Sequence, residues 1–322
     1  DRVWAAMIEQ GWLGVAVPED RGGLGFGTVE LAVLLEEVGR HATPVPFAPT
    51  VLAIGALDAA GRADDVERLV SGEMVGAVAW SARPDAVTAR EDGGAWVLDG
   101  RPDPTLYGAS ASVLLVVATA PDGPALFRVD LDAVGRPAAE PAIDRTRELA
   151  WVRCAATPAD RIGGADAVEA LVDRGAVFAS AEMLGGASRV LELTVEYAKD
   201  RVQFGRPIGS FQAIKHKCAD MLVDVEGMRS TVYWAAWCIG AADPEASVAA
   251  STAKIWTADA SKRVMANGLQ VHGGIGFTWE HDLHLFLKRS QLDQQTFGDA
   301  GYHRVRLAAL LRPRVAAGTG VI

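Results

Sequence analysis

The amino-acid sequence predicts an α+β fold with a helical N-terminal domain, a small β-barrel or sandwich domain in the middle, and a C-terminal four-helix bundle. Apolar residues recur at helical spacing in the first and last parts of the chain, whereas the middle part holds short β-branched runs between turn residues. The chain has 322 residues, which is long for a single hydrophobic core. We therefore place three domains at residues 1–73, 74–162 and 163–322.

The N-terminal domain is expected to contain short helices and one irregular loop. The run GVAVPEDRGGLGFG at 14–27 is too rich in glycine and proline to form a helix. Thr28 suits a helix start, and Gly39 marks the end of that helix after a stripe of leucine and valine. The expected helices are 1–10, 28–39, 49–60 and 63–71.

The middle domain changes to short extended runs at a spacing of roughly ten residues, which is typical of a small barrel or sandwich. Turn clusters separate the runs, such as EDGG at 91–94 and PDG at 121–123. The expected strands are 75–80, 86–89, 95–98, 113–118, 125–129 and 149–154.

The C-terminal domain is predicted to be an up-down bundle, because long helical segments follow one another with short connections. The first segment is expected to be interrupted at Gly185-Gly186. In the second, apolar residues from Phe211 to Val232 line one helix face, among them Leu222. The expected segments are 165–201, 211–240, 243–271 and 281–311.

Composition and charge exclude several classes of function. The net charge of −10 and the pI near 5.1 disfavour nucleic acids and anionic membranes as partners. No apolar run approaches the ~20 residues that span a bilayer. Three cysteines without CxxC spacing (Cys154, Cys218 and Cys238) indicate reduced thiols in a cytoplasmic protein. No signal peptide is seen, and because the chain starts at Asp1 rather than methionine, an upstream segment is expected to be missing.

The most informative stretch joins the first two helical segments of the bundle. Arg201 stands in the last helical turn before a Gly/Pro stop, where any cation complements the helix dipole. The full string RVQFGRPIGSFQ, from Arg201 to Gln212, is much more specific. It closely resembles the R-x-x-F-G-x-P-I-x-x-F-Q signature of acyl-CoA dehydrogenases.

A second stretch, QVHGGIGF, begins at Gln270, 69 residues after Arg201. A G-G-x-G loop alone is a weak signal, but in this order it resembles the same family's Q-x-x-G-G-x-G-[FY] segment. Glycine suits such a segment because backbone amides approach a pyrophosphate only where no Cβ intervenes. The run from Gly14 to Gly25 also resembles the family's P-E-x-x-G-G-x-G loop, so the resemblance covers nearly the whole chain.

The resemblance implies an activity and a cofactor. Enzymes of this family remove two hydrogens from the Cα–Cβ bond of an acyl-CoA thioester: a glutamate takes the α-proton, a hydride passes to FAD, and an electron-transfer flavoprotein reoxidises the flavin. By resemblance, six residues would hold the pyrophosphate and adenine end of an FAD that is bound largely by a neighbouring subunit. They are Arg201, Gln203, Phe204, Gln270, Gly273 and Gly274.

Both usual positions of the family's catalytic glutamate lack a carboxylate. The commoner position lies about 27 residues beyond the motif glutamine, and here it is Phe297. The other position lies 26 residues before the motif arginine, and here it is Gly175. The resemblance therefore predicts a chain without its own catalytic base.

The β domain departs from the family pattern as well. The segment 77–85 lacks the acidic-Pro and Gly-Ser elements that usually lie beside the flavin, and Tyr107-Gly108-Ala109-Ser110 replaces the usual I-T-N-x run. We hypothesise a heteromer in which this chain completes the FAD site of a homologous catalytic subunit. The pattern resembles the smaller subunit of actinobacterial α2β2 acyl-CoA dehydrogenases that shorten steroid side chains, and that resemblance implies a steroid-type acyl-CoA substrate.

Other interpretations stay open at this point. A displaced carboxylate would make the chain a self-sufficient homo-oligomeric dehydrogenase, and the candidates are Asp299 and Asp173, with Asp293 and Glu182 behind them. An oxidase or monooxygenase on the same fold is a weaker alternative. No metal site is expected, because His272, His281, His284 and His303 match no recognised ligand pattern.

Overall fold

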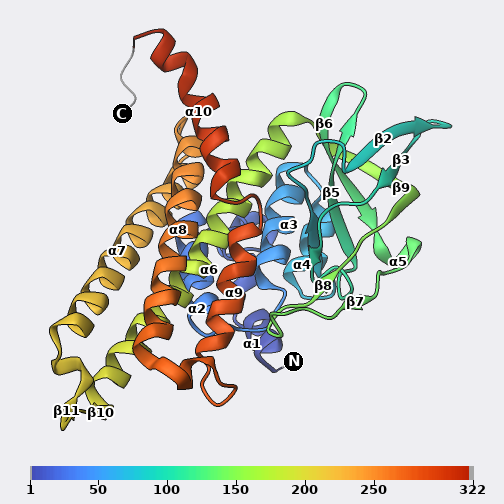
Figure 1. Cartoon of the computed structure of the whole chain (residues 1–322). Helices are drawn as coiled ribbons and strands as arrows, with labels where there is room; N and C mark the ends of the chain where they lie inside the picture. Colours follow the sequence, from blue (N-terminus) through green and yellow to red (C-terminus); the bar gives the residue numbers. More distant parts are fainter. Residues whose placement is uncertain (1, 319–322) are drawn as a thin grey trace. The chain divides into compact units, whose positions relative to one another are not determined.

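The computed structural model describes residues 2–318, so Asp1 of the first expected helix and the last four residues of the third expected domain lie outside it. The chain divides into two compact units, each described by itself below. Unit 1 comprises Asp1–Leu31 and Pro44–Gly175, and unit 2 comprises Ala32–Thr43 and Ala176–Ile322. Figure 1 shows the helices and strands of the chain. The domain boundaries after residues 73 and 162 stay predictions.

The helices of unit 1 lie close to their expected positions. They are α1 (Arg2–Glu9), α3 (Phe47–Ala59) and α4 (Ala63–Val70), and α2 (Thr28–Arg40) begins in this unit. Helix α3 starts two residues earlier than expected, because Phe47 is fully buried and extends its apolar face. The loop predicted at 14–27 is mostly irregular, but Glu19–Arg21 forms a single 3-10 turn that the prediction missed.

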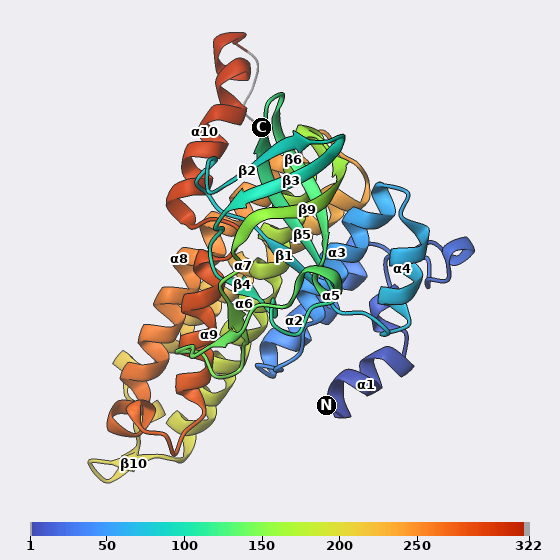
Figure 2. The same ribbon diagram turned by 90° about the vertical axis from the view of Figure 1, so that its right-hand side faces the viewer.

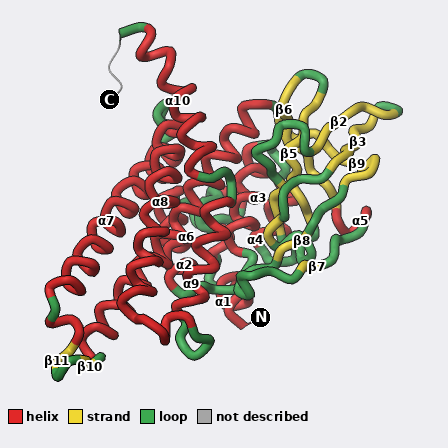
Figure 3. Tube along the Cα trace, in the orientation of Figure 1, coloured by secondary structure: helices red, strands yellow, loops and turns green. Residues whose placement is uncertain are grey.

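A six-stranded sheet in unit 1 closes on itself. The strand order is β1-β5-β2-β3-β9-β6, and an additional β5–β6 pairing joins its last strand to β5, which confirms the predicted barrel (Figure 3). Its inner side chains include Leu98, Leu114, Val116 and Phe127. The strands are β1 (Gly76–Ala79), β2 (Val87–Asp92), β3 (Ala95–Gly100), β5 (Val113–Ala120), β6 (Gly123–Asp130) and β9 (Cys154–Gly163).

Strand β9 corrects the sequence expectation, which ended the last strand at Cys154. Its sequence CAATPADRIG has few large apolar residues, so it gave no strand signal. It nevertheless pairs with both β3 and β6 and thereby closes the barrel. The remaining short elements of unit 1 are β4 (Thr105–Leu106), β7 (Ala139–Glu140), β8 (Leu149–Ala150) and α5 (Leu131–Val134).

Helix α6 (Ala165–Asp200) runs without a break through Gly185-Gly186, so the predicted interruption is wrong. The glycines serve packing instead. A Cβ on Gly185 would overlap the carbonyl oxygen of Glu36 and lie 2.6 Å from the backbone nitrogen of Arg40, both on α2. Gly39 of α2 meets the carbonyl of Glu182 in the same way. Small residues therefore let the backbones of α2 and α6 approach closely within unit 2.

Within the described residues, unit 2 also contains the helices α7 to α10, which Figure 2 labels. They are α7 (Gln212–Gly240), α8 (Ala246–His272), α9 (Leu283–Gln295) and α10 (Ala300–Ala316). The predicted face of α7 buries Met221, Val225, Met228 and Val232, but Leu222 is half exposed and does not belong to it. The expected segment 281–311 is two helices, because the chain turns between them. The helical and β parts together confirm the predicted fold class.

Between α6 and α7 lie a short hairpin, β10 (Val202–Gln203) and β11 (Arg206–Pro207), and the turn Ile208–Ser210. After α8 comes the 3-10 segment Gly273–Phe277. We call residues 201–207 the arginine hairpin and Gly273–Phe277 the glycine loop. No helix in the described part of the chain has the length and hydropathy needed to cross a membrane.

Candidate cofactor-binding surface

The two motif segments meet at one end of unit 2. Tyr197, in the last turn of α6, stacks on His272, the last residue of α8, with ring centroids 4.5 Å apart and ring planes at 20°. Arg201 follows Tyr197 by one helical turn, and Gly273 follows His272 directly. The arginine hairpin and the glycine loop therefore lie at the same end of the bundle, as both ribbon views show (Figures 1 and 2).

The polar residues predicted to bind the cofactor face solvent. Arg201, Gln203 and Gln270 are exposed. Within residues 2–318 the Arg201 guanidinium has no hydrogen-bond or ion-pair partner, and the Gln203 amide donates only to the neighbouring carbonyl of Val202, at 2.8 Å. A guanidinium and two amides provide donors that suit phosphate and carbonyl oxygens.

Apolar side chains surround these donors. Phe204, at the tip of the hairpin, is 91% exposed and has a φ of 54°, and Gly205 follows with a φ of 78°. The rings of Phe204 and Phe211 meet edge to face with centroids 6.0 Å apart, while Arg206 stacks over Phe211 at 4.2 Å. Such a group of exposed apolar side chains marks a surface that another molecule covers. The group comprises Val202, Phe204, Ile275, Phe277 and Trp279.

The glycines of the loop fall into two kinds. A Cβ on Gly273 or Gly274 would meet no atom of the chain within 4 Å, so open space lies beside both residues. Gly273 has a φ of 63°, which disfavours any other residue there. Gly276 is different, because its Cβ would lie 3.1 Å from the Cβ of His272. Gly276 is therefore required by the chain's own packing, whereas Gly273 and Gly274 leave room for a ligand.

Hydrogen bonds and packing contacts fix the backbone of the segment that holds Phe297. Phe297 is half-buried with a φ of 55°, and its carbonyl accepts a hydrogen bond from Nε2 of His303 at 2.8 Å. Asp299 is exposed, and its carboxylate caps α10 by accepting from the backbone N–H of Tyr302 at 2.8 Å. Gly298 has a φ of 92° and packs against the ring of Tyr302. The backbone of this segment is fixed, yet it presents an aromatic ring.

Lys254 of α8 holds the backbone before Phe297 through hydrogen bonds from the interior of unit 2. The sequence analysis did not identify this residue. Its ammonium, fully buried, donates to the carbonyls of Asp293 at 2.6 Å, Gln294 at 3.3 Å and Thr296 at 2.8 Å. Burial lowers the pKa of Lys254 to about 7, against the opposing effect of the Asp293 and Asp299 carboxylates. The available signal was a lysine inside the alanine-rich run SVAASTAKIW, where a helix face without other charges predicts burial.

The other candidate base positions are all buried. Asp173 and Gly175 are buried in the part of α6 that belongs to unit 1. Glu182 and Asp293 are buried in unit 2. Their roles stay predictions.

The histidines lie in aromatic contacts. His272 and His281 meet edge to face with centroids 4.6 Å apart, and His284 packs on Trp279 at the same distance. His303 is buried, and burial lowers its pKa to about 4.

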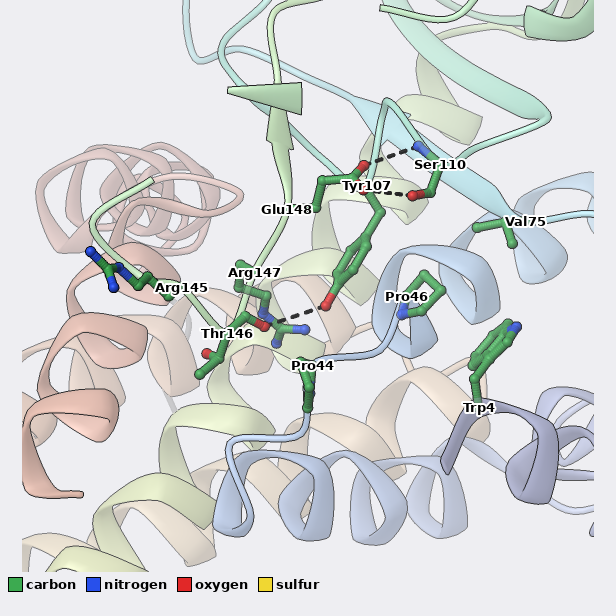
Figure 4. A pocket seen from close by; sticks show the side chains of 10 residues that line it. All are labelled: Trp4, Pro44, Pro46, Val75, Tyr107, Ser110, Arg145, Thr146, Arg147 and Glu148. Carbon is green, nitrogen blue, oxygen red and sulfur yellow. Dashed lines mark hydrogen bonds between the residues drawn. The ribbon is translucent and has the colours of Figure 1, made fainter. Parts of the chain in front are cut away.

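Unit 1 contains a pocket of about 440 Å³ beside the run Tyr107–Ser110 (Figure 4). Tyr107 has a φ of 56°, and its hydroxyl reaches the carbonyl of Thr146 at 3.5 Å. Glu148 accepts hydrogen bonds from the backbone N–H of Ser110 at 3.0 Å and from its hydroxyl at 2.6 Å. The polar atoms of this run are therefore engaged within unit 1. The other lining residues are Trp4, Pro44, Pro46, Val75, Arg145 and Arg147.

Comparison with known proteins identifies the family. Residues 1–72 match the N-terminal domain of acyl-CoA dehydrogenases, and residues 163–311 match the C-terminal domain. Acyl-CoA dehydrogenase IpdE2 of Mycolicibacterium smegmatis is 36% identical over 308 residues, which cover 95% of this chain and 87% of the relative. The chain belongs to the acyl-CoA dehydrogenase family.

Further relatives are similar in sequence and structure. Acyl-CoA dehydrogenase FadE34 of Mycobacterium tuberculosis is 35% identical over a match that covers 99% of this chain but 43% of FadE34. Among solved structures, the Tcur3481-Tcur3483 steroid ACAD G363A variant superposes with a TM-score of 0.90 at 35% identity, covering 98% of this chain and 89% of that one. The ChsE4-ChsE5 complex from Mycobacterium tuberculosis gives a TM-score of 0.88 at 32% identity, with 97% and 88% covered. The first of these two structures is named a steroid ACAD, and the second is named a complex of ChsE4 and ChsE5.

Proposed function

We propose that this chain is the subunit of an FAD-dependent acyl-CoA dehydrogenase that completes the FAD site of a homologous catalytic partner. The reaction is the α,β-dehydrogenation of an acyl-CoA thioester, and the proposed substrate is a steroid whose side chain is linked to CoA. One observation carries the proposal: the arginine hairpin and the glycine loop present exposed donors and open glycines. Phe297 stands where the family resemblance places the base.

The chemistry of the exposed surface fits the cofactor. Arg201, Gln203 and Gln270 would donate to the pyrophosphate and the adenine end, and the open space at Gly273 and Gly274 would admit phosphate oxygens next to the backbone. The exposed ring of Phe204 would cover the apolar part of the adenine or of the partner. FAD, when bound, supplies the hydride acceptor of the reaction.

This chain does not supply the proton acceptor. A phenyl ring cannot take a proton, and the hydrogen bonds of Lys254 and His303 hold the backbone of that segment in place. The Asp299 carboxylate is engaged in capping α10. Loss of a positioned base typically costs about 10²–10⁴ in rate, so the partner has to provide it.

The β domain also supports the proposal that the partner, and not this chain, holds the flavin ring. The side chains of Tyr107 and Ser110 bond to Thr146 and Glu148 within unit 1. By resemblance, the run Tyr107–Ser110 replaces the family segment that usually lies beside the flavin. We infer that this chain binds no flavin in a site of its own.

The comparisons favour a partner of the same family. The ChsE4-ChsE5 neighbour is a complex of two subunits. The match to FadE34 leaves more than half of that relative unmatched, which is room for a second chain of this size. We therefore propose an α2β2 assembly in the cytoplasm that passes its electrons to an electron-transfer flavoprotein.

The alternative is a homo-oligomer in which Asp299 or Asp173 acts as the base. The test measures flavin content and dehydrogenation rate of the chain alone and co-expressed with its catalytic homologue, using a bulky acyl-CoA and an artificial electron acceptor. The proposal predicts a colourless, inactive chain and a yellow, active pair. A lone chain that holds flavin and turns over would refute it.

A matched pair of variants tests the cofactor surface directly. Arg201→Ala should lower the affinity of the pair for FAD about tenfold or more, because a charge-assisted phosphate contact is lost. Lys199→Ala is the control, since Lys199 is an exposed cation in the last turn of α6, two residues before Arg201. Equal losses of FAD affinity in the two variants would show that Arg201 acts only through its positive charge and makes no specific contact with the phosphate.

A further inference from the structure

The glycine loop rests on a buried histidine. His272, the last residue of α8, is 3% exposed and lies between two rings. Tyr197 of α6 stacks on one face at 4.5 Å, and His281, beyond the loop, meets the ring edge to face at 4.6 Å. The same imidazole therefore contacts a residue before the arginine hairpin and a residue after the glycine loop.

A hydrogen bond fixes the orientation of this imidazole. Nδ1 of His272 lies 2.8 Å from the carbonyl oxygen of Gly268, and because a carbonyl only accepts, Nδ1 carries the proton. Burial lowers the pKa of His272, and the neighbouring His281 adds to the effect, so the ring is neutral at neutral pH. Nε2 is buried without a partner among the described residues, which leaves the Gly268 bond as the polar restraint on the ring.

The loop folds back over the same residue. A Cβ on Gly276 would lie 3.1 Å from the Cβ of His272, so the fourth residue of the loop packs directly on the residue that precedes it. The N–H and the hydroxyl of Thr278 both donate to the carbonyl of Ile275, at 3.1 and 2.8 Å, and close the end of the loop. His272 therefore directly precedes the loop, packs against Gly276 within it, and contacts His281 beyond it.

We propose that His272 is the positioning residue of the glycine loop: its imidazole, held by Gly268 and clamped between Tyr197 and His281, sets the path of Gly273–Phe277 toward the pyrophosphate of the partner's FAD. The inference rests on the proposed function, because it assumes that this loop contacts the cofactor. His272 itself does not have to touch FAD.

Three variants of His272 separate the effect of the ring contacts from the effect of the hydrogen bond to Gly268. His272→Asn keeps a side-chain N–H at the position of Nδ1 but loses the ring, and His272→Phe keeps the ring but loses the donor. His272→Ala loses both. In the co-expressed pair, the dissociation constant of FAD should rise about tenfold or more for His272→Ala, since an aromatic contact and a hydrogen bond are lost together. Asparagine and phenylalanine should each restore part of the affinity.

The matched control is His284→Ala, which removes a histidine from the Trp279 contact and leaves the contacts of His272 in place. Amide hydrogen exchange of residues 273–279 provides a readout that does not depend on activity. Exchange there should accelerate in His272→Ala, with the β-barrel unchanged, and FAD affinity should stay within about twofold of wild type in His284→Ala.

The inference is overturned if the pair with His272→Ala binds FAD like wild type. It is also overturned if His272→Ala and the control His284→Ala weaken FAD binding equally. Arg201→Ala distinguishes this failure from a failure of the proposed function. If Arg201→Ala weakens FAD binding and His272→Ala does not, only the role of His272 is wrong. If neither variant changes FAD binding, the proposed function fails as well.

Discussion

Replacing Lys254 with methionine should change how the stability of the chain depends on pH. In the wild type the ammonium is buried among the carbonyls of Asp293, Gln294 and Thr296. Methionine has a similar length and no donor. The variant loses three hydrogen bonds at the end of α9, each contributing about 1 kcal/mol or more. The substitution also removes the free-energy cost of burying a charge. The difference in stability between wild type and variant therefore depends on whether Lys254 is protonated in the wild type.

The sign of that dependence follows from the pKa. Burial lowers the pKa of Lys254 from 10.5 to about 7 in the folded chain. Between these values the unfolded chain binds more protons than the folded chain, so the free energy of unfolding rises with pH across this window. The cost of burial is fully present below pH 7 and fades towards pH 10.5. From pH 6 to pH 9 this group alone should raise the wild-type stability by about 3 kcal/mol.

Urea denaturation of both proteins at fixed concentration, repeated between pH 6 and pH 9, measures the effect. The difference in unfolding free energy between wild type and Lys254→Met should grow by about 2–3 kcal/mol as the pH rises, because methionine does not titrate. Two parallel pH profiles would refute the reasoning, since Lys254 would then keep its proton in the folded chain throughout the range.

Three further predictions follow from single contacts. Gly185→Ala should destabilise the chain by about 3 kcal/mol in thermal or urea unfolding, because the new methyl overlaps the carbonyl of Glu36; an unchanged midpoint would show that α2 and α6 separate freely. Phe204→Ser should leave the melting temperature of the lone chain unchanged, because the ring is 91% exposed, and should weaken retention of FAD by the pair in gel filtration. Asp299→Ala should cost about 1 kcal/mol of stability through loss of the cap on Tyr302 and leave the activity of the pair intact, and a loss of ~10²-fold in rate would instead identify Asp299 as the base.

The sequence predicted the helices and most of the barrel because their residues carry a clear period. It missed strand β9, since small and polar residues alternate there without large apolar side chains, and the strand is specified by its two neighbours. Gly185 was interpreted as a helix break, although its role is a contact with α2 that sequence spacing does not reveal. Local patterns do not show which distant backbone a glycine will meet.

The candidate site shows the same limit. The motif strings predicted the residues of the arginine hairpin and the glycine loop, and the family resemblance assigned both segments to one FAD, but the strings did not reveal the contact that joins them. The stacking of Tyr197 on His272 does so, and it joins residues 75 positions apart. Lys254 was invisible for the same reason, because its partners are backbone carbonyls of another helix.

We propose that this chain contributes to a partner's FAD site and has no FAD site of its own. Flavin stoichiometry of the purified pair, from flavin absorbance and subunit quantification after gel filtration, is the decisive measurement. We expect one FAD for each pair of unlike subunits, and loss of that FAD when the pair is built with Arg201→Ala. One FAD on every subunit, or a pair that keeps its FAD with Arg201→Ala, would show that the proposal is wrong.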